Sequence, residues 1–220
     1  MKFKITESAN LNNPEIVIQF IKENCKPYLL AKGNYNGQLF RGQYDIDKNF
    51  FIGKVRKNRE PERTELQLHF LLDKAFLKIF GWKARSQGLF VSGDWGTAAT
   101  YGDPYVIFPI GEFKFVWSPD YADLYTVPIL TGELTDDDPA VKKWKKANKK
   151  GRYEILKQRP DILENFLKYD YTNKNLIKAI KSNNEIAIDC DKYVAIKVIE
   201  SYDNKQKYSE YIKILKGVSK

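Results

Sequence analysis

The chain has 220 residues, of which 43% are hydrophobic and 14% aromatic, and its formal net charge is +9. This composition supports one packed domain and excludes an intrinsically disordered chain. No apolar run is long enough to span a bilayer, and the first ten residues lack the apolar core of a signal peptide, so we expect a cytoplasmic protein. The positive charge indicates an anionic ligand or partner.

Few side chains of the kinds that form disulfides or ligate transition metals are present. Cys25 and Cys190 are the two cysteines, far apart in the chain, and His69 is the one histidine. We therefore predict two buried free thiols and no metal site. His69 lies in an apolar helical pattern, which favours a packing role over a role as a catalytic base.

Capping residues and apolar periodicity predict helices over residues 12–25, 61–80, a short stretch after Asp94, 139–152, 161–169, 173–182 and 207–217. Residues rich in β-branched and aromatic side chains predict strands over 39–44, 88–92, a hairpin of two strands within 103–118, 184–189 and 192–200. Residues 45–60 are charged and irregular, and we interpret them as an exposed loop.

This order of elements predicts an α+β fold with a mixed or antiparallel β-core flanked by helices. Regular βαβ alternation and a GxGxxG motif are both missing, which argues against a doubly wound sheet. We expect a single domain over residues 1–220, with a basic helical insertion at about 136–182. That insertion begins with three aspartates and continues into a lysine-rich helix around Trp144.

Three stretches carry polar residues where strands begin or end. "LFRG" places Arg41 and Gly42 after an apolar pair, and a guanidinium fork matches the oxygens of a pyrophosphate. "LFVSGD" places Ser92 at the end of an apolar strand, and "NEIAID" places Glu185 at the mouth of another. Taken singly, each residue also has a purely structural interpretation. Arg41 could form an ion pair, Ser92 could be a turn residue, and Glu185 could be an exposed strand end.

Taken together, the three stretches resemble the mono-ADP-ribosyltransferases of the Arg-Ser-Glu type, including small basic members encoded by bacteriophages. The matching motifs are Phe40-Arg41-Gly42, then Phe90-Val91-Ser92 followed by Ala98 and Tyr101, and finally Glu185. The resemblance spans about residues 38–199 and implies the split β-core of that family. It also implies an enzyme that takes NAD as substrate, needs no metal, and acts on a host or invader factor inside a bacterial cell.

The resemblance implies a role for each matching residue. Arg41 would bind the phosphates of NAD, the backbone at Gly42 would hold the nicotinamide amide, and Ser92 would orient Glu185. Glu185 would hydrogen-bond the nicotinamide ribose and stabilise the positive charge that develops on the sugar when the nicotinamide leaves. The aromatic side chains that could stack on nicotinamide are Tyr101, Tyr105 and Trp117.

Two features bear on the acceptor. Family members that modify arginine have a glutamate two residues before the catalytic one, but here that position is Asn183, which resembles the Gln-x-Glu variants. Lys145 and Lys146 lie in the basic helix, which is either a solvated face or a docking surface for an anionic acceptor. We expect a protein acceptor. The alternatives are a nucleic-acid acceptor, or a binding module for protein or nucleic acid whose site has decayed.

Overall fold

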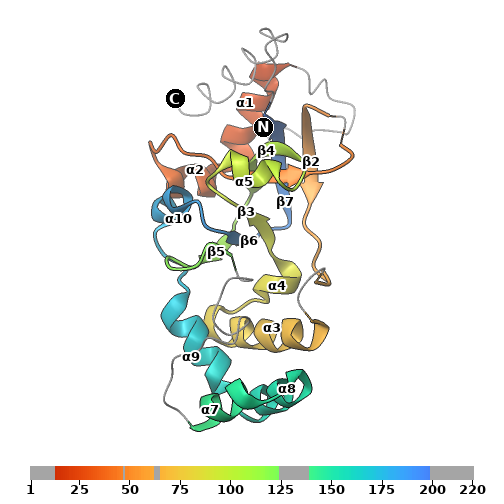
Figure 1. Ribbon diagram of the computed structural model, residues 1–220. Helices are drawn as coiled ribbons and strands as arrows, with labels where there is room; N and C mark the ends of the chain where they lie inside the picture. The colour runs from red at the N-terminus through yellow and green to blue at the C-terminus, as the bar shows by residue number, and fades with distance from the viewer. Residues whose placement is uncertain (1–12, 47, 62–64, 124–138, 199–220) are drawn as a thin grey trace.

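The structure is a computed structural model that describes residues 13–46, 48–61, 65–123 and 139–198 (Figure 1). The helix predicted over 207–217 and the three aspartates at 136–138 lie outside the described residues.

Helices and short antiparallel strands make up the described part of the chain. The helices are α1 (Pro14–Asn24), α2 (Lys26–Lys32), α3 (Leu66–Phe80), α4 (Ala84–Gln87), α5 (Trp95–Ala99), α7 (Pro139–Lys146), α8 (Lys149–Gln158), α9 (Asp161–Asp170) and α10 (Leu176–Ser182). The strands are β1 (Phe40–Gln43), β2 (Phe50–Lys54), β3 (Leu89–Val91), β4 (Asp103–Ile110), β5 (Lys114–Trp117), β6 (Ile186–Asp189) and β7 (Lys192–Lys197).

The strands form two antiparallel sheets, one in the order β1-β4-β7-β2 and the other in the order β3-β6-β5. This arrangement confirms the predicted α+β class. The two sheets meet where Phe40 and Ser92 exchange both backbone hydrogen bonds, at N–O distances of 2.7 and 2.9 Å. We call this Phe40–Ser92 pair the seam. It joins the first strand of one sheet to the first strand of the other.

Two expectations about strands are wrong. The stretch predicted as an exposed loop, residues 45–60, contains β2, because Phe50, Phe51 and Ile52 pair with the last strand, β7. The strands predicted as a hairpin, β4 and β5, do not pair with each other. β4 lies between β1 and β7, and β5 pairs with β6, so the turn after Ile110 carries the chain from one sheet to the other.

Local capping signals fix several helix ends as expected. The side chain of Asn13 accepts a hydrogen bond from the N–H of Glu15 and caps α1. Gly81 ends α3 in the left-handed conformation. The side chain of Asp94 accepts a hydrogen bond from the N–H of Thr97 and caps α5, as the sequence predicts.

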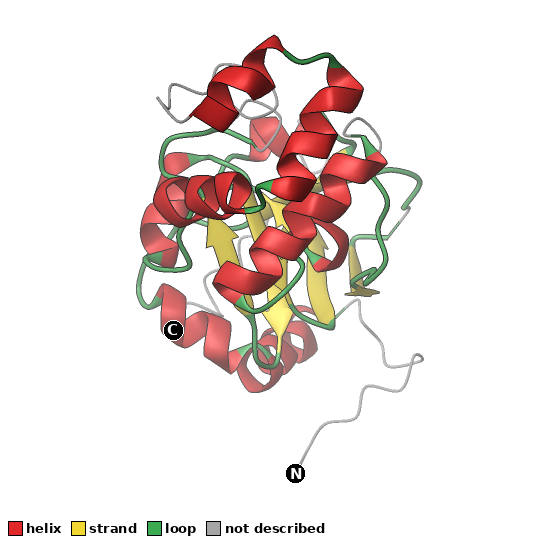
Figure 2. Ribbon diagram, turned by 90° about the horizontal axis from the view of Figure 1, so that it is seen from below, coloured by secondary structure: helices red, strands yellow, loops and turns green. Residues whose placement is uncertain are grey.

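The apolar side chains form two clusters. One cluster joins the larger sheet and strands of the smaller sheet to α1, α2 and α10. The other joins α3 and α4 to α7, α8 and α9, and reaches the smaller sheet through Val116 and Ala187. In Figure 1, α3, α7, α8 and α9 gather at one end of the molecule, and in Figure 2, seen from that end, helices lie in front of the strands.

The basic region folds as two helices instead of the single one predicted over 139–152. α7 ends at Lys146, and the side chain of Asn148 caps α8 by accepting a hydrogen bond from the N–H of Gly151. Trp144 is buried, and the guanidinium of Arg152 lies 4.8 Å from its ring centroid. The tryptophan is therefore part of the core and is not exposed for docking.

Cys25 and Cys190 are buried free thiols, as predicted. Among the helices that the structure describes, none has both the length and the apolar character needed to cross a membrane.

Candidate functional site

The structure brings the Arg41, Ser92 and Glu185 stretches together at the seam. Ser92 pairs with Phe40, the residue before Arg41. The last pair of the β3–β6 ladder is Val91 with Ile186, so Ser92 and Glu185 follow it at the same end of the two strands. Three segments that are far apart in the sequence therefore present their polar residues at one place.

Arg41 is half-buried and tied to the smaller sheet. Its Nη1 donates a hydrogen bond of 2.7 Å to the carbonyl oxygen of Phe90, and its Nε is buried with no hydrogen-bond partner in the described structure. Burial lowers the pKa of Arg41, the charges of Arg59 and Arg56 lower it further, and Tyr193 and Glu185 raise it. The guanidinium stays charged, so the site holds a partly desolvated cation that an anionic ligand would stabilise.

Two further arginines gather at Phe90. The guanidinium carbon of Arg59 lies 4.7 Å from the centroid of the Phe90 ring, and that of Arg85 lies 5.3 Å from it. With Arg41 on the Phe90 carbonyl, three guanidinium groups surround one residue. We call Arg41, Arg59 and Arg85 the arginine cluster. Arg85 also faces the Glu185 carboxylate, so Arg41 and Arg59 are the members of the cluster whose charge suits an anionic ligand such as a diphosphate.

Ser92 acts on the backbone before Glu185. Its buried hydroxyl donates a hydrogen bond of 2.7 Å to the carbonyl oxygen of Asn183 and accepts one from the N–H of Asp94. A serine hydroxyl has one proton to donate, and here that proton goes to Asn183. Ser92 therefore fixes the backbone two residues before Glu185.

The side chain of Glu185 is partly exposed to solvent, and its backbone is held by a hydrogen bond. Its N–H donates a 2.6 Å hydrogen bond to the carbonyl oxygen of Ala122, and its side chain is 32% exposed. Arg85 Nη1 lies 3.9 Å from Glu185 Oε1. A cavity of about 10 Å³, at the lower limit for holding one water, is lined by residues that include Glu185, Arg85 and Tyr171. Burial raises the pKa of Tyr171 well above its ordinary value, and the Glu185 charge adds to this effect, so the phenol stays protonated beside the carboxylate.

Gly42 lies against the chain that follows α5. A Cβ atom at this position would lie 2.5 Å from the carbonyl carbon of Tyr101 and 2.6 Å from its oxygen, so the glycine is required by the close approach of two backbones. Tyr101 itself is 53% exposed beside Gly42. The Tyr101 side chain is therefore accessible to a ligand.

The other aromatic candidates belong to the core. Tyr105 is fully buried, and its hydroxyl lies 2.9 Å from the carbonyl oxygens of both Ile46 and Lys48, which share its one proton. Trp117 is 5% exposed, and its indole N–H donates to the carbonyl oxygen of Lys174. Both rings therefore pack in the core, and of the three aromatic candidates Tyr101 is the exposed one.

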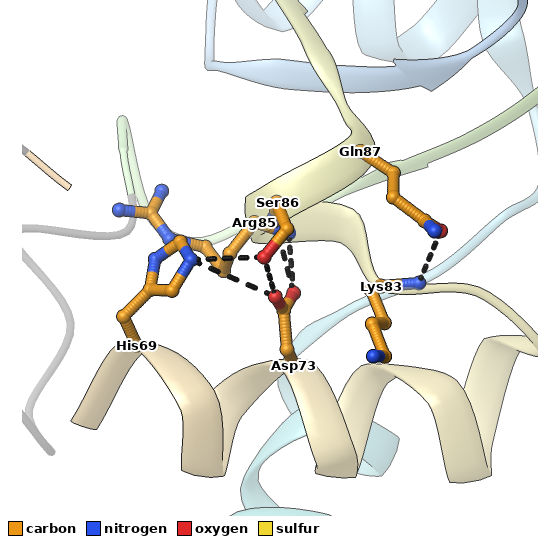
Figure 3. A network of polar contacts seen from close by, with 6 residues as sticks. All are labelled: His69, Asp73, Lys83, Arg85, Ser86 and Gln87. Carbon is orange, nitrogen blue, oxygen red and sulfur yellow. Dashed lines mark hydrogen bonds and ion pairs between the residues drawn. The ribbon is translucent and has the colours of Figure 1, made fainter. Parts of the chain in front are cut away.

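A buried network of His69, Asp73 and Ser86 lies beneath the site (Figure 3). His69 Nε2 is 3.0 Å from Ser86 Oγ and 3.6 Å from Asp73 Oδ2, and Ser86 Oγ also donates to Asp73. A catalytic triad needs the acid on one ring nitrogen of the histidine and the serine on the other, whereas here both face Nε2. All three side chains are buried, so the network is structural, in agreement with the packing role expected for His69.

The predicted acceptor-binding residues lie in two places. Asn183 is exposed beside Glu185, in the left-handed conformation that follows α10. Lys145 and Lys146 are exposed on α7, at the end of the molecule away from β1 and β3 (Figure 1). The structure therefore brings Asn183 to the candidate site and leaves the two lysines outside it.

Sequence reasoning did not find Arg59 or Arg85. Both lie outside the three motifs, Arg59 in a charged stretch and Arg85 in a four-residue helix, α4. Their proximity to Glu185 and Arg41 depends on tertiary packing around Phe90. In the part of the chain that the structure describes, no group of three or more His, Cys, Asp or Glu residues is arranged to hold a metal ion.

No protein-family model, no curated protein and no solved structure matches this chain.

Proposed function

We propose that this chain is a mono-ADP-ribosyltransferase that transfers ADP-ribose from NAD to a macromolecular acceptor, with a protein as the favoured acceptor. The observation that supports the proposal is the convergence of Arg41, Ser92 and Glu185 at the seam between the two sheets. These are the three residues on which the sequence resembles the Arg-Ser-Glu type of this family.

The chemistry needs an anion site and a carboxylate, and both are present. Arg41 and Arg59 supply positive charge for the diphosphate of NAD. When the bond between the nicotinamide nitrogen and the ribose C1′ breaks, its electron pair leaves with nicotinamide, and positive charge develops on the sugar. The Glu185 carboxylate, held by its backbone bond to Ala122, stabilises that charge.

The acceptor nucleophile then attacks the ribose C1′ and releases its proton to the solvent. Asn183 is exposed at the edge of the site and offers an amide that can hydrogen-bond this nucleophile. An amide does not titrate near neutral pH, so Asn183 takes no part as a base. Ser92 fixes the carbonyl of this same residue, which links the position of the acceptor to that of the carboxylate.

The first experiment measures NAD binding and cleavage by the purified protein. At 100 times its dissociation constant, NAD should stabilise the folded state by about 2.7 kcal/mol, which raises the melting temperature of a chain of this size by about 5–10 °C. Nicotinamide release should fall about 100- to 1,000-fold in Glu185→Gln. In Arg41→Lys, the KM for NAD should rise, because lysine keeps the charge and loses the fork.

Glu112→Gln is the matched control, because Glu112 is an exposed carboxylate in the turn between β4 and β5. A cell lysate incubated with NAD labelled in the ADP-ribose part then identifies the acceptor. A protease-sensitive label supports a protein acceptor, and a label lost only to nuclease would assign the activity to nucleic acid. The absence of both a thermal shift and nicotinamide release would refute the proposal.

A further inference from the structure

Arg85 is the arginine whose guanidinium faces the Glu185 carboxylate. The two side chains are 17% and 32% exposed, so the 3.9 Å between Arg85 Nη1 and Glu185 Oε1 is only partly screened by water. Ion pairs on a protein surface contribute little to stability, but a partly buried pair restricts where its members can lie.

The guanidinium of Arg85 has a second contact that restricts it. It lies over the Phe90 ring at 5.3 Å, within the range of a cation–π interaction. Phe90 is itself held, because its carbonyl oxygen accepts the hydrogen bond from Arg41. The guanidinium of Arg85 is therefore held between the Phe90 ring and the Glu185 carboxylate.

The backbone of Arg85 is anchored by the buried network. Asp73 Oδ1 accepts hydrogen bonds from the N–H groups of Arg85 and Ser86, at 2.9 and 3.2 Å (Figure 3). Asp73 belongs to α3, a helix of 15 residues, and is 2% exposed. A four-residue helix such as α4 is marginal by itself, so this buried anchor fixes the point from which the Arg85 side chain extends.

We propose that Arg85 is a positioning residue that orients the Glu185 carboxylate in the reaction. The inference rests on the proposed function. The single hydroxyl proton of Ser92 is donated to the carbonyl of Asn183, so Ser92 fixes the backbone, and Arg85 fixes the carboxylate. Arg85 acts through Glu185, whereas Arg41 and Arg59 act on the diphosphate of NAD.

The test compares Arg85→Met, Arg85→Lys and Glu185→Gln in steady-state NAD cleavage. Methionine keeps the stem of the side chain and removes the charge. We expect kcat to fall about 100-fold in Arg85→Met, the loss that a misplacement near 1 Å can cause, with the KM for NAD unchanged. Arg85→Lys should recover part of kcat. In the Glu185→Gln background, Arg85→Met should cause no further loss, because the group it orients is already gone.

Other outcomes would overturn the inference. A raised KM for NAD with kcat unchanged would make Arg85 a ligand-binding residue, and additive losses in the double variant would show that it acts independently of Glu185. A urea-denaturation cycle with the same single and double variants adds a readout that needs no activity. Non-additive changes in the free energy of unfolding support the Arg85–Glu185 pair, and additive changes overturn it. Failure of the wild-type protein to cleave NAD would refute the proposed function itself, whatever the cycle gives.

Discussion

Gly93 follows Ser92 of the seam and packs against the end of α10. Its substitution tests whether this contact positions the residues of the candidate site. A Cβ atom at residue 93 would lie 2.7 Å from the carbonyl carbon of Ile180, 3.1 Å from its Cα and nearer still to its oxygen. The atoms that it would meet are backbone, so no side chain can rotate away.

Gly93→Ala should therefore separate the end of β3 from α10. A Cβ atom essentially never lies within 3.0 Å of a backbone atom, and the Ile180 oxygen is the nearest of the three, so one segment must move by more than about 1 Å. We expect this overpacking to lower the free energy of unfolding by about 3 kcal/mol, the upper end of the usual effect of an overpacked site. Such a loss lowers the melting temperature by about 6–12 °C. Because α10 leads directly to Asn183 and Glu185, kcat for NAD cleavage should fall by up to about 100-fold.

Thermal melting and steady-state nicotinamide release measure the two effects. Gly96→Ala is the control, because it lies in α5 and the nearest atom to its added Cβ is a side-chain oxygen of Asp94 at 3.3 Å. Alanine is about 1 kcal/mol better than glycine inside a helix, so this variant should melt at or above the wild-type temperature. A Gly93→Ala protein with wild-type melting temperature and wild-type turnover would refute the reasoning.

Three other predictions follow from the site and its surroundings. Asn183→Gly should melt at the wild-type temperature, because Asn183 has φ +62° and glycine accepts that conformation, but it should alter labelling of the acceptor. Asn183→Ala should lower the free energy of unfolding by about 1 kcal/mol. Equal stability of the two variants would contradict this account. The double variant Lys145→Glu, Lys146→Glu should reduce acceptor labelling and leave nicotinamide release unchanged. Lys114→Glu, at an exposed position on β5, is the control. An equal loss of labelling and of nicotinamide release would contradict a docking role for the two lysines. Burial lowers the pKa of His69, so the unfolded chain binds a proton more readily than the folded one, and the free energy of unfolding should fall as pH drops below about 6.5. Urea denaturation across pH checks this, His69→Gln should flatten the dependence, and a profile identical in the two proteins would contradict it.

The sequence predicted elements whose signals are local. Asn13 with Pro14 marked the start of α1, Gly81 the end of α3, and Asp94 the cap of α5. Each of these signals depends on hydrogen bonds within a few residues, so it can be recognised without knowledge of the fold.

Strand pairing was predicted less well, because it depends on distant partners. β2 consists of consecutive apolar residues without alternation, within a charged stretch, and it forms because β7 lies beside it. The turn between β4 and β5 has the composition of a hairpin, yet the two strands pair with β1, β6 and β7. Period-2 patterns describe single strands and leave the choice of partner open.

The candidate site was predicted in part for the same reason. Arg41, Ser92 and Glu185 were recognised through a resemblance of short motifs, and the structure brings them together. Arg85 has no motif around it, and its relation to Glu185 depends on α4 being held by Asp73 from another helix. A contact that depends on the packing of distant segments gives no motif or periodic pattern by which it could be predicted from the sequence.

The seam has a mechanical consequence. Among the described strands, backbone pairing between the two sheets consists of the hydrogen bonds of Phe40 and Ser92. Arg41 belongs to a strand of one sheet and Glu185 precedes a strand of the other, so a ligand held by both residues would oppose the separation of the sheets at this pair. The amide protons of Phe40 and Ser92 would then exchange with solvent more slowly in the presence of NAD, while those inside the β4–β7 ladder keep their rates.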